Sequence, residues 1–303
     1  MKTQRYYSHG KLLLTGEYLV LDGAKALAIP CKYGQYLQVS STATEKSSWH
    51  SYDHHQKAWF SVEFDLNDVI SNKINGENEL EQRLFQILRE TYKLNSKVFY
   101  QNYNFETQLE FPRNWGLGTS STLISNIAQW ADVDAYQLLE NTFGGSGYDI
   151  ACALASSALT FQLTNIKPKV DKAVFPEALI PYTYFLHLGE KQNSRSAINN
   201  YRAHKPLNLK TIVSEVGSLS DAFQKTSSLK EGQDVIKKHE EMLSEVLGID
   251  PIKSRLFPNF DGQVKSLGAW GGDFVLVLSQ TNPKDYFKKK GYKTLLTFKE
   301  MAL

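Results

Sequence analysis

The sequence predicts an α+β fold. Helix-type and strand-type segments are mixed along the chain without the strict strand–helix–strand repetition of a parallel α/β sheet. Of the 303 residues, 42% are hydrophobic and 22% are charged, which is typical of a globular protein with a substantial core. The length fits two domains of ordinary size, and we find no internal repeat and no low-complexity segment.

The first forty residues have the pattern of strands. Short apolar or aromatic runs separated by glycines predict strands at residues 5–8, 12–14, 18–21, 24–29 and 36–40. The stretch 41–57 is polar and rich in Ser, Thr and His, so we expect a loop or a hairpin there.

The hydrophobic period then becomes helical. Leu80, Leu84, Ile87, Leu88 and Tyr92 fall on one stripe and predict a helix over 77–94. An extended segment at 97–111 leads through a glycine-rich turn into a predicted helix at 120–131. A second helix, at 135–143, is expected to end at a pair of glycines.

The second half begins after a proline-rich stretch. A strand at 158–163 precedes residues 164–182, which carry three of the nine prolines and predict domains of residues 1–175 and 176–303. Beyond it we expect a strand at 182–188 and helices at 194–204, 210–223 and 232–247. Strands at 263–267, 274–279 and 293–298 follow, with a short helix before the last.

Net charge indicates which partners to expect, and the cysteines and apolar runs indicate the cellular compartment. The net charge is only +2, which gives no electrostatic reason to expect nucleic acid or an anionic membrane. Cys31 and Cys152 have no metal-site spacing, which favours a reducing compartment. No apolar run is long enough for a signal peptide or a membrane span, so we expect a cytoplasmic protein.

The segment 112–122 is the strongest candidate for binding an anion. Gly116 and Gly118 let the backbone curl so that several N–H groups can point inward, and the N-terminus of a helix follows. Thr119, Ser120 and Ser121 add hydroxyl groups. A simple Ser/Thr helix cap is the alternative. Three successive hydroxyl residues exceed what a cap requires, which favours a triphosphate with its magnesium.

A second small-residue turn lies at 144–153. Ser146 and Gly147 allow close approach of a ligand, and Asp149 stands at the start of a short helix. A helix cap explains this carboxylate as well as a catalytic role does. Beside a substrate, Asp149 could accept a hydroxyl proton during phosphoryl transfer.

Two further segments give weaker signals. Lys11 begins an apolar strand, where many lysines simply extend to the surface, and Glu17 follows a glycine between two apolar runs. Glycines at 268, 271 and 272 suit a hairpin, or a loop packed against a phosphate-binding turn.

Taken in order, these segments resemble the GHMP kinase superfamily, named for galactokinase and for homoserine, mevalonate and phosphomevalonate kinases. Residues 10–21 resemble its first motif. Its phosphate motif P-x-x-x-G-L-G-[ST]-S is matched at every fixed position by Pro112, Gly116, Leu117, Gly118, Thr119 and Ser120. Its Ser-Gly-x-Asp segment is matched by Ser146, Gly147 and Asp149. Its late glycine motif is matched by Lys265, Gly268, Ala269, Gly271, Gly272 and Asp273.

Details of these motifs resemble the mevalonate-pathway branch. Phosphomevalonate kinases usually have Gly-Glu-Tyr in the first motif, as Gly16, Glu17 and Tyr18 do here, whereas mevalonate kinases have Gly-Glu-His. Residues 188–202 resemble the segment that these kinases place near the acceptor. Trp270 departs from the pattern, because the late motif normally has glycine there.

The resemblance implies an N-terminal ribosomal-S5-like domain and a C-terminal ferredoxin-like domain, with ATP and acceptor in the cleft between them. It implies that Asp149 is the base or orients the acceptor, and that Lys11 lowers the pKa of the acceptor hydroxyl or balances charge. It places ATP at Pro112, Gly116, Leu117, Gly118, Thr119, Ser120 and Ser121. It suggests Mg2+ at Ser120 and Glu140, although Glu140 is closer to Asp149 than the family spacing.

For the acceptor, motif position and charge suggest Glu17, Tyr18, Ser146, Gly147, Lys191, Ser194, Arg195, Gly268, Ala269 and Gly271. We therefore expect a kinase of phosphomevalonate, a small anionic acceptor, with no nucleic-acid or membrane partner, as a monomer or homodimer. Mevalonate kinase, a non-catalytic protein that binds ATP or a metabolite, and a decarboxylase of the same superfamily are the alternatives.

Overall fold

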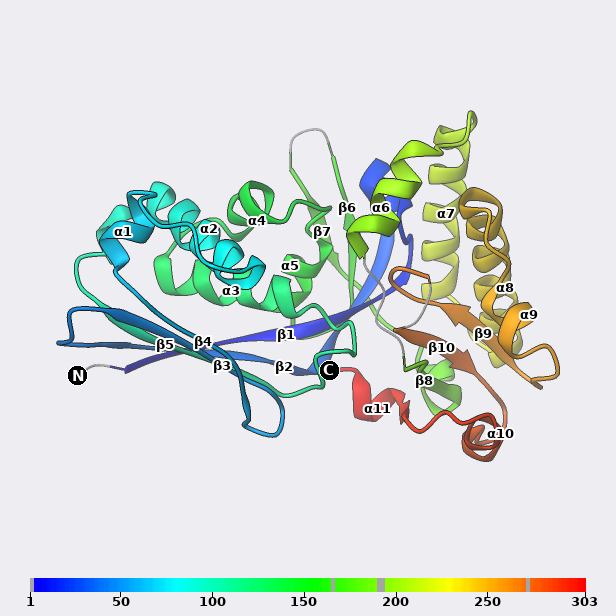
Figure 1. The fold of residues 1–303 in the computed structure, drawn as a ribbon. Helices are drawn as coiled ribbons and strands as arrows, with labels where there is room; N and C mark the ends of the chain where they lie inside the picture. The colour runs from blue at the N-terminus through cyan, green and yellow to red at the C-terminus, as the bar shows by residue number, and fades with distance from the viewer. Residues whose placement is uncertain (1–2, 165–166, 190–193, 271–272) are drawn as a thin grey trace. The chain divides into compact units, whose positions relative to one another are not determined.

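The computed structural model describes residues 3–164, 167–189, 194–270 and 273–303, and it folds into two compact units (Figure 1). Unit 1 comprises Met1–Gly10, Tyr33–Arg113 and Gly118–Leu154. Unit 2 comprises Lys11–Lys32, Asn114–Leu117 and Ala155–Leu303. Each unit is thus assembled from separate stretches of chain, and the domain boundary near residue 175 stays a prediction. The mixture of helices and strands is as predicted.

Unit 1 contains a mixed sheet. Its strands lie in the order β4-β3-β5-β2, and β1 also pairs with β2. The β3–β5 pair is parallel, whereas the β3–β4 and β2–β5 pairs are antiparallel. The strands are β1 (Thr3–Thr15), β2 (Ala26–Ser41), β3 (Ser47–Tyr52), β4 (Ala58–Phe64) and β5 (Tyr103–Leu109). Along the chain, β1 and β2 both continue into unit 2.

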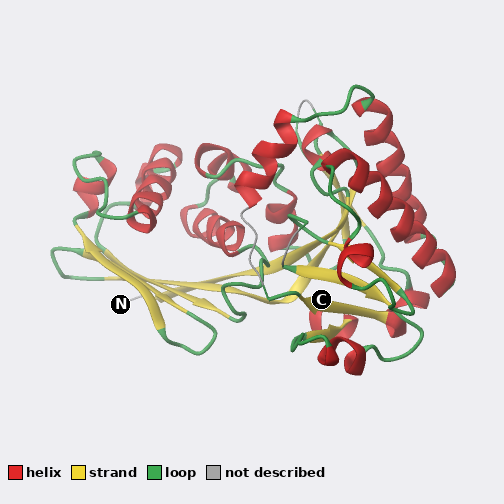
Figure 2. Cartoon of the chain, turned by 45° about the vertical axis from the view of Figure 1, so that its right-hand side comes forward, coloured by secondary structure: helices red, strands yellow, loops and turns green. Residues whose placement is uncertain are grey.

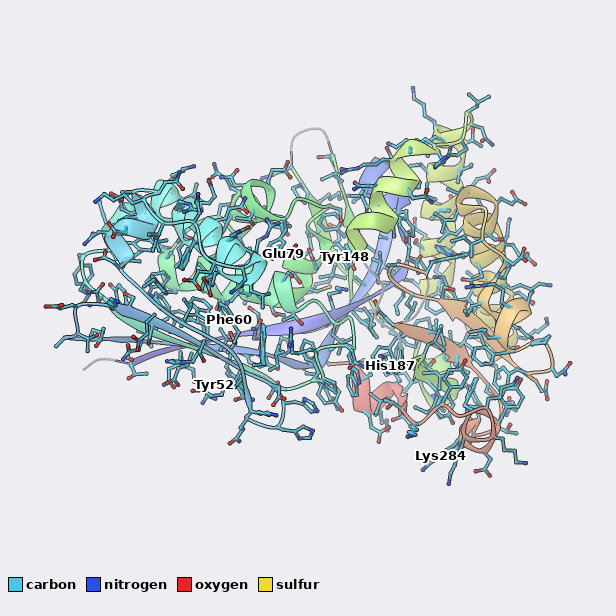
Figure 3. All side chains as sticks on the ribbon, in the orientation of Figure 1. Tyr52, Phe60, Glu79, Tyr148, His187 and Lys284 are labelled. Carbon is cyan, nitrogen blue, oxygen red and sulfur yellow. The ribbon has the colours of Figure 1, made fainter. Side chains whose placement is uncertain are left out.

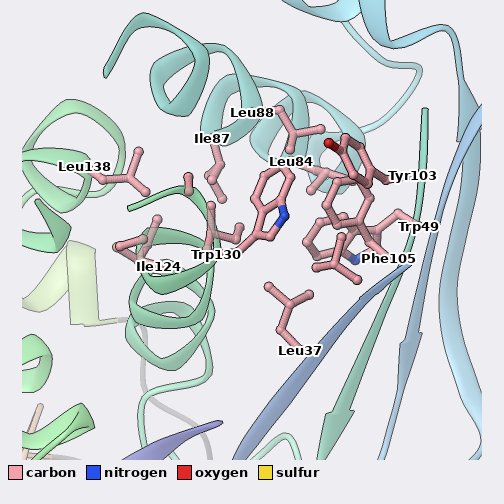
Figure 4. Close-up of a cluster of buried hydrophobic side chains, with 14 of the residues drawn as sticks. Leu37, Trp49, Leu84, Ile87, Leu88, Tyr103, Phe105, Ile124, Trp130 and Leu138 are labelled. Atoms are coloured by element: carbon pink, nitrogen blue, oxygen red, sulfur yellow. The ribbon is translucent and has the colours of Figure 1, made fainter. Parts of the chain in front are cut away.

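The helices of unit 1 lie on one face of this sheet (Figures 1 and 2). They are α1 (Leu66–Ile70), α2 (Glu79–Leu94), α3 (Thr119–Ala131), α4 (Ala135–Thr142) and α5 (Tyr148–Ala153), with the 3-10 turn η2 (Ser96–Val98). Their apolar stripes and the inner face of the sheet form one buried cluster. Figure 4 shows Trp130 of α3 in this cluster, together with Leu84 and Leu88 of α2 and the aromatic side chains of Trp49 and Phe105.

Unit 2 contains the rest of β1 and β2, a short two-strand extension and a separate sheet. The extension pairs β2 with β6 (Leu159–Gln162), and β6 with β7 (Lys169–Lys172). The separate sheet is antiparallel in the order β11-β8-β10-β9. Its strands are β8 (Thr183–His187), β9 (Gln263–Ser266), β10 (Phe274–Leu278) and β11 (Leu295–Thr297).

Two long helices, α7 (Leu209–Gln224) and α8 (Leu229–Leu247), pack together in unit 2. Ser228 caps the start of α8, and Gly248 ends it in a left-handed conformation. The remaining helices are α6 (Ser194–Ala203), α9 (Ile252–Leu256), α10 (Lys284–Lys289) and α11 (Phe298–Met301), with the 3-10 turns η1 (Leu19–Asp22) and η3 (Glu177–Tyr182).

Several predicted elements differ from the structure. The strands expected at 5–8 and 12–14 form one continuous strand, β1, and those at 24–29 and 36–40 form one strand, β2. The strand expected at 18–21 is wrong, because Tyr18 has a φ of 60° and the chain then forms η1, which buries Leu19 and Val20 in succession. Residues 41–57 do contain a hairpin strand, β3, whose continuation as β4 and α1 was not predicted.

Each unit holds one buried thiol, Cys152 in unit 1 and Cys31 in unit 2. Burial raises the pKa of Cys31 to about 12, although the nearby Lys11 acts in the opposite direction. Within the described ranges, no helix is both long enough and apolar enough to cross a membrane.

Candidate functional site

The glycine loop ends in a helix that has no side-chain cap. Gly116 and Gly118 have φ values of 67° and 93°, a region that favours glycine. Gly118 is the N-cap of α3, and as a glycine it has no side chain that could accept a hydrogen bond from the first turn of that helix. Ser120, in this first turn, is exposed. The simple Ser/Thr cap is therefore not what the structure contains, and the first-turn amides remain free of a side-chain cap.

The middle of this loop is anchored within unit 2. His187, at the end of β8, donates through Nε2 to the carbonyl oxygen of Asn114 at 3.1 Å. The ring of Trp115 meets Phe274 of β10 edge-on, with centroids 5.4 Å apart. His187 is labelled in Figure 3. No signal in the sequence identified these aromatic anchors, because each is only a single ring in an otherwise ordinary segment.

Lys11 and Asp273 converge on Gly116. The Lys11 ammonium donates to the carbonyl oxygen of Gly116 at 3.1 Å, and the Lys11 amide donates to that of Leu117 at 3.0 Å. The Asp273 carboxyl group lies so close that a Cβ on Gly116 would be 2.4 Å from its Cγ. Three segments that are far apart in sequence thus meet within unit 2. Lys11 is half-buried, and its head group makes this contact with the loop.

Asp149 lies in the first turn of α5, next to Tyr148 (Figure 3). The N-cap of α5 is Gly147, whose φ is 86° and whose Cα faces the ring of Tyr136, so Asp149 is not the capping residue. Its Oδ1 accepts the amide of Ile150 at 3.0 Å, and the side chain is half-buried. Because α5 packs against α3 within unit 1, the Asp149 helix neighbours the helix that begins after the glycine loop. Ser146, just before this turn, is buried.

The predicted metal ligands stay predictions. Glu140 is exposed on α4, and Ser120 is exposed on α3. Among the residues that the structure describes, no group of three or more His, Cys, Asp or Glu side chains could hold a metal ion. A magnesium ion bound with a nucleotide needs only one or two protein ligands, since phosphate and water oxygens supply the rest. The Ser120 hydroxyl in an uncapped first turn fits that requirement.

Glu17 is fully buried, with an exposed fraction of 0%, and its Oε1 accepts a hydrogen bond from Lys265 of β9. Burial raises the pKa of Glu17 from its ordinary value of 4.5 to about 7, while the Lys265 charge acts to lower it. The neighbouring Tyr18 is also buried, and its ring lies 5.6 Å from that of Tyr201 in α6. Their predicted contact with the acceptor stays a prediction.

The late glycine loop holds a strained tryptophan. Trp270 has a φ of 56°, a conformation that suits glycine and strains a bulky residue. Its side chain is 2% exposed, and its indole N–H has no hydrogen-bond partner in the described part of the chain. Gly268 has a φ of 59°, and Ala269 is half-buried.

Several predicted acceptor residues lie outside what the structure describes. Lys191 and Gly271 fall in the gaps at 190–193 and 271–272. Ser194 and Arg195 begin α6, but their side chains are not among those described. Their roles stay predictions.

The chain has the fold of the GHMP kinases. It superposes on the mevalonate kinase of Methanococcus jannaschii with a TM-score of 0.70 over 98% of both chains, at 16% identity. It superposes on Streptococcus pneumoniae phosphomevalonate kinase, solved in complex with phosphomevalonate and AMPPNP, with a TM-score of 0.70 over 97% of this chain and 99% of that one, at 16% identity.

A third solved structure, Lactococcus lactis galactokinase complexed with galactose, gives a TM-score of 0.66 over 98% of this chain and 93% of that one, at 11% identity. No protein-family model matches the chain, and no curated protein matches it in sequence. The predicted fold is thus confirmed by three-dimensional similarity, whereas the ribosomal-S5-like and ferredoxin-like descriptions of its two domains stay predictions.

Proposed function

We propose that this protein is an ATP-dependent small-molecule kinase, and that its acceptor is phosphomevalonate. The fold is shared with kinases of mevalonate, phosphomevalonate and galactose, which supports phosphoryl transfer to a small molecule. The Gly-Glu-Tyr sequence at residues 16–18 favours phosphomevalonate among these acceptors.

The uncapped start of α3 is the observation that carries the proposal. Two glycines with positive φ lead into a 13-residue helix whose first turn has no side-chain cap. Such a terminus presents N–H donors and the positive end of the helix dipole, which together favour a phosphate group. The exposed Ser120 hydroxyl stands in the same turn. A purely structural helix start would more usually be closed by a Ser, Thr, Asp or Asn side chain.

Phosphoryl transfer also needs a group that manages the acceptor proton and groups that balance charge. In this proposal the Asp149 carboxylate accepts the hydroxyl proton of the acceptor. Lys11 supplies positive charge, and its hydrogen bond to Gly116 keeps that charge at the glycine loop. Ser120 is the residue that would hold magnesium, which neutralises phosphate charge when bound.

An anionic acceptor would need its own cationic partners. Arg195 and Lys191 are assigned that role in this proposal, because a guanidinium binds phosphate or carboxylate through two parallel hydrogen bonds. Mevalonate lacks the phosphate ester, so it would place a smaller demand on these two side chains.

The direct test is ADP release with phosphomevalonate, mevalonate, homoserine and galactose as acceptors. We expect turnover with phosphomevalonate and little with the other three. Turnover with mevalonate instead would reassign the acceptor while leaving the kinase class intact. ATP binding without turnover on any acceptor would favour a non-catalytic nucleotide-binding protein.

The base is tested with Asp149→Asn. We expect phosphoryl transfer to fall by a factor of about 10² to 10⁴, while ATP affinity, measured by titration calorimetry, stays close to that of wild type. Asp132→Asn is a matched control in unit 1, since Asp132 is exposed and has a φ of 53°, which asparagine also tolerates. Activity that survived Asp149→Asn would remove Asp149 as the base.

A further inference from the structure

Unit 2 buries a cluster of ionisable side chains that the proposed reaction does not use directly. It consists of Glu17 from the turn after β1, His239 and Glu240 from α8, and Lys265 from β9, each with an exposed fraction of at most 1%. Removing charges from water is costly, and similar pairs can often be replaced by apolar residues without loss of stability. The cluster therefore calls for an explanation other than stability alone.

The cluster is joined through directional bonds. The Lys265 ammonium donates to Glu17 Oε1 and, at 2.8 Å, to the carbonyl oxygen of Ser266. Glu240 accepts the amide and hydroxyl of Ser266, both at 3.0 Å, and the amide of Ile252 at 3.1 Å. Glu240 is thus held by several donors, whereas the Glu17 carboxylate depends chiefly on Lys265.

His239 fixes the other side of the turn that carries Glu17. Its Nε2 accepts the amide of Gly16 at 2.9 Å, so in the neutral ring the proton lies on Nδ1. Gly16 itself cannot be replaced easily, because its φ is 84° and a Cβ there would lie 2.7 Å from that of Ala26. The turn is therefore clamped by its backbone to α8 and by its side chain to β9.

Both chain segments joined by Glu17 and Lys265 lead to the glycine loop. Towards the N-terminus, Glu17 is six residues from Lys11, which donates two hydrogen bonds to the segment Asn114–Leu117. Towards the C-terminus, Lys265 is eight residues from Asp273, whose carboxyl group packs on Gly116. The two segments are therefore joined to each other by the Glu17–Lys265 ion pair, and each contacts the glycine loop, one through Lys11 and the other through Asp273.

We propose that Glu17 and Lys265 form a positioning pair that sets where Lys11 and Asp273 meet the glycine loop. The inference rests on the proposed kinase function. It gives Glu17 a role different from direct contact with the acceptor, in agreement with its complete burial. Because the pair acts through Lys11, which in the proposed function balances charge during transfer, we expect the pair to govern the rate of transfer more than the affinity for ATP.

The test uses Glu17→Gln, Lys265→Met and the double variant in the full chain. We expect each single variant to lower kcat between about 10- and 100-fold, the scale of a small misplacement of a catalytic group, while the KM for ATP changes less than about threefold. The double variant removes both members of the Glu17–Lys265 pair, so neither is left buried without the other and its unfolding midpoint should recover. Its kcat should stay low, because the hydrogen bond between residues 17 and 265 is still missing.

A readout independent of turnover separates this inference from the proposed function. The Lys11 amide is held by Leu117, so its hydrogen exchange reports the loop contact directly. We expect its exchange to accelerate at least about tenfold in each single variant, whereas the Leu27 amide, bonded to Thr15 at 3.0 Å, should change little. This measurement applies whether or not wild type turns over any acceptor, and Glu17→Gln supplies it if Lys265→Met does not fold.

Lys25→Met and Asp221→Asn are the matched controls, since they break an ion pair of 2.7 Å in the same unit that is partly exposed. They should leave kcat and the Lys11 exchange rate within about twofold of wild type. The proposal is overturned if the double variant regains wild-type kcat together with its stability, because the pair would then be structural only. Unchanged Lys11 exchange in both single variants would also overturn it.

Discussion

The buried cluster of unit 1 and the buried ionic cluster of unit 2 hold their surroundings by opposite means. Around Trp49, Phe105 and Trp130, rings pack stacked or edge-on with centroids 5.1 Å apart, and Phe105 contacts both tryptophans. Around Glu17 and Lys265, the Lys265 ammonium has two specific partners, Glu17 Oε1 and the carbonyl oxygen of Ser266, and removal of Lys265 or of Glu17 leaves the other side chain buried without its partner. Apolar packing is not directional, so neighbouring side chains can shift, whereas the hydrogen bonds of an ion pair fix the positions of the two segments that carry it.

The largest loss of stability should come from a change in the apolar cluster of unit 1. Phe105→Ala removes a fully buried ring from the centre of the sheet and leaves a cavity. We expect the free energy of unfolding to fall by about 3 to 5 kcal/mol, measured by urea denaturation. The loss should be the same at low and high pH, because no titratable group of this cluster changes. A loss below about 1 kcal/mol would mean that the cluster collapses around the gap.

A smaller, pH-dependent effect should come from Glu17. Its pKa of about 7 in the folded chain lies above the ordinary value of 4.5, so the folded state binds the proton more tightly. The free energy of unfolding contributed by this group is therefore greatest at low pH and falls as pH rises from about 4.5 to about 7. Glu17→Gln removes that decline, and its stability relative to wild type should rise by about 1 to 3 kcal/mol between pH 5 and pH 8.

Other ionisable groups that face Glu17 also contribute to the pH dependence of stability. Lys265 approaches from β9, and His239 and Glu240 approach from α8. Burial, followed by the Lys265 charge, lowers the pKa of His239, so this residue makes stability rise with pH below its ordinary range. His239 is present in both proteins, and the difference between them isolates Glu17. A difference that stayed constant with pH would show that Glu17 does not titrate in this range.

The smallest effect should come from an ion pair that water reaches. Lys25 and Asp221 lie 2.7 Å apart with side chains 34% and 43% exposed. Asp221→Asn should cost no more than about 1 kcal/mol, because solvent screens the pair. Thermal unfolding in low and high salt is the measurement, and the cost should shrink as salt is added. A cost that matched Lys265→Met would erase the distinction between the two kinds of pair.

The regular parts of the fold could be predicted because their periodicity is clear. The apolar stripe of α2 and the long helices of unit 2 follow directly from it. Strand β3 was hidden, since two of its inward-facing residues are serines. Ser51 accepts hydrogen bonds from Trp49 Nε1 at 3.0 Å and from Thr107 at 2.9 Å, so its burial depends on pairing that hydropathy does not show.

The candidate site could be predicted where a motif is continuous in sequence. The positive φ of Gly116 and Gly118 and the start of α3 agree with the pattern of residues 112–122. The ionic cluster could not be predicted, because Glu17 is more than two hundred residues from both His239 and Lys265 and no local pattern in the sequence links the three side chains. Only the tertiary fold shows that they share one dry interior.

The two cysteines provide reporters that need no engineered label. Each unit has one thiol, both are buried, and the sequence contains no others. A thiol reagent added to the native protein can therefore react only after the surrounding unit opens. Mass spectrometry of the peptides around residues 31 and 152 would follow the opening of each unit separately, in one sample, with and without nucleotide.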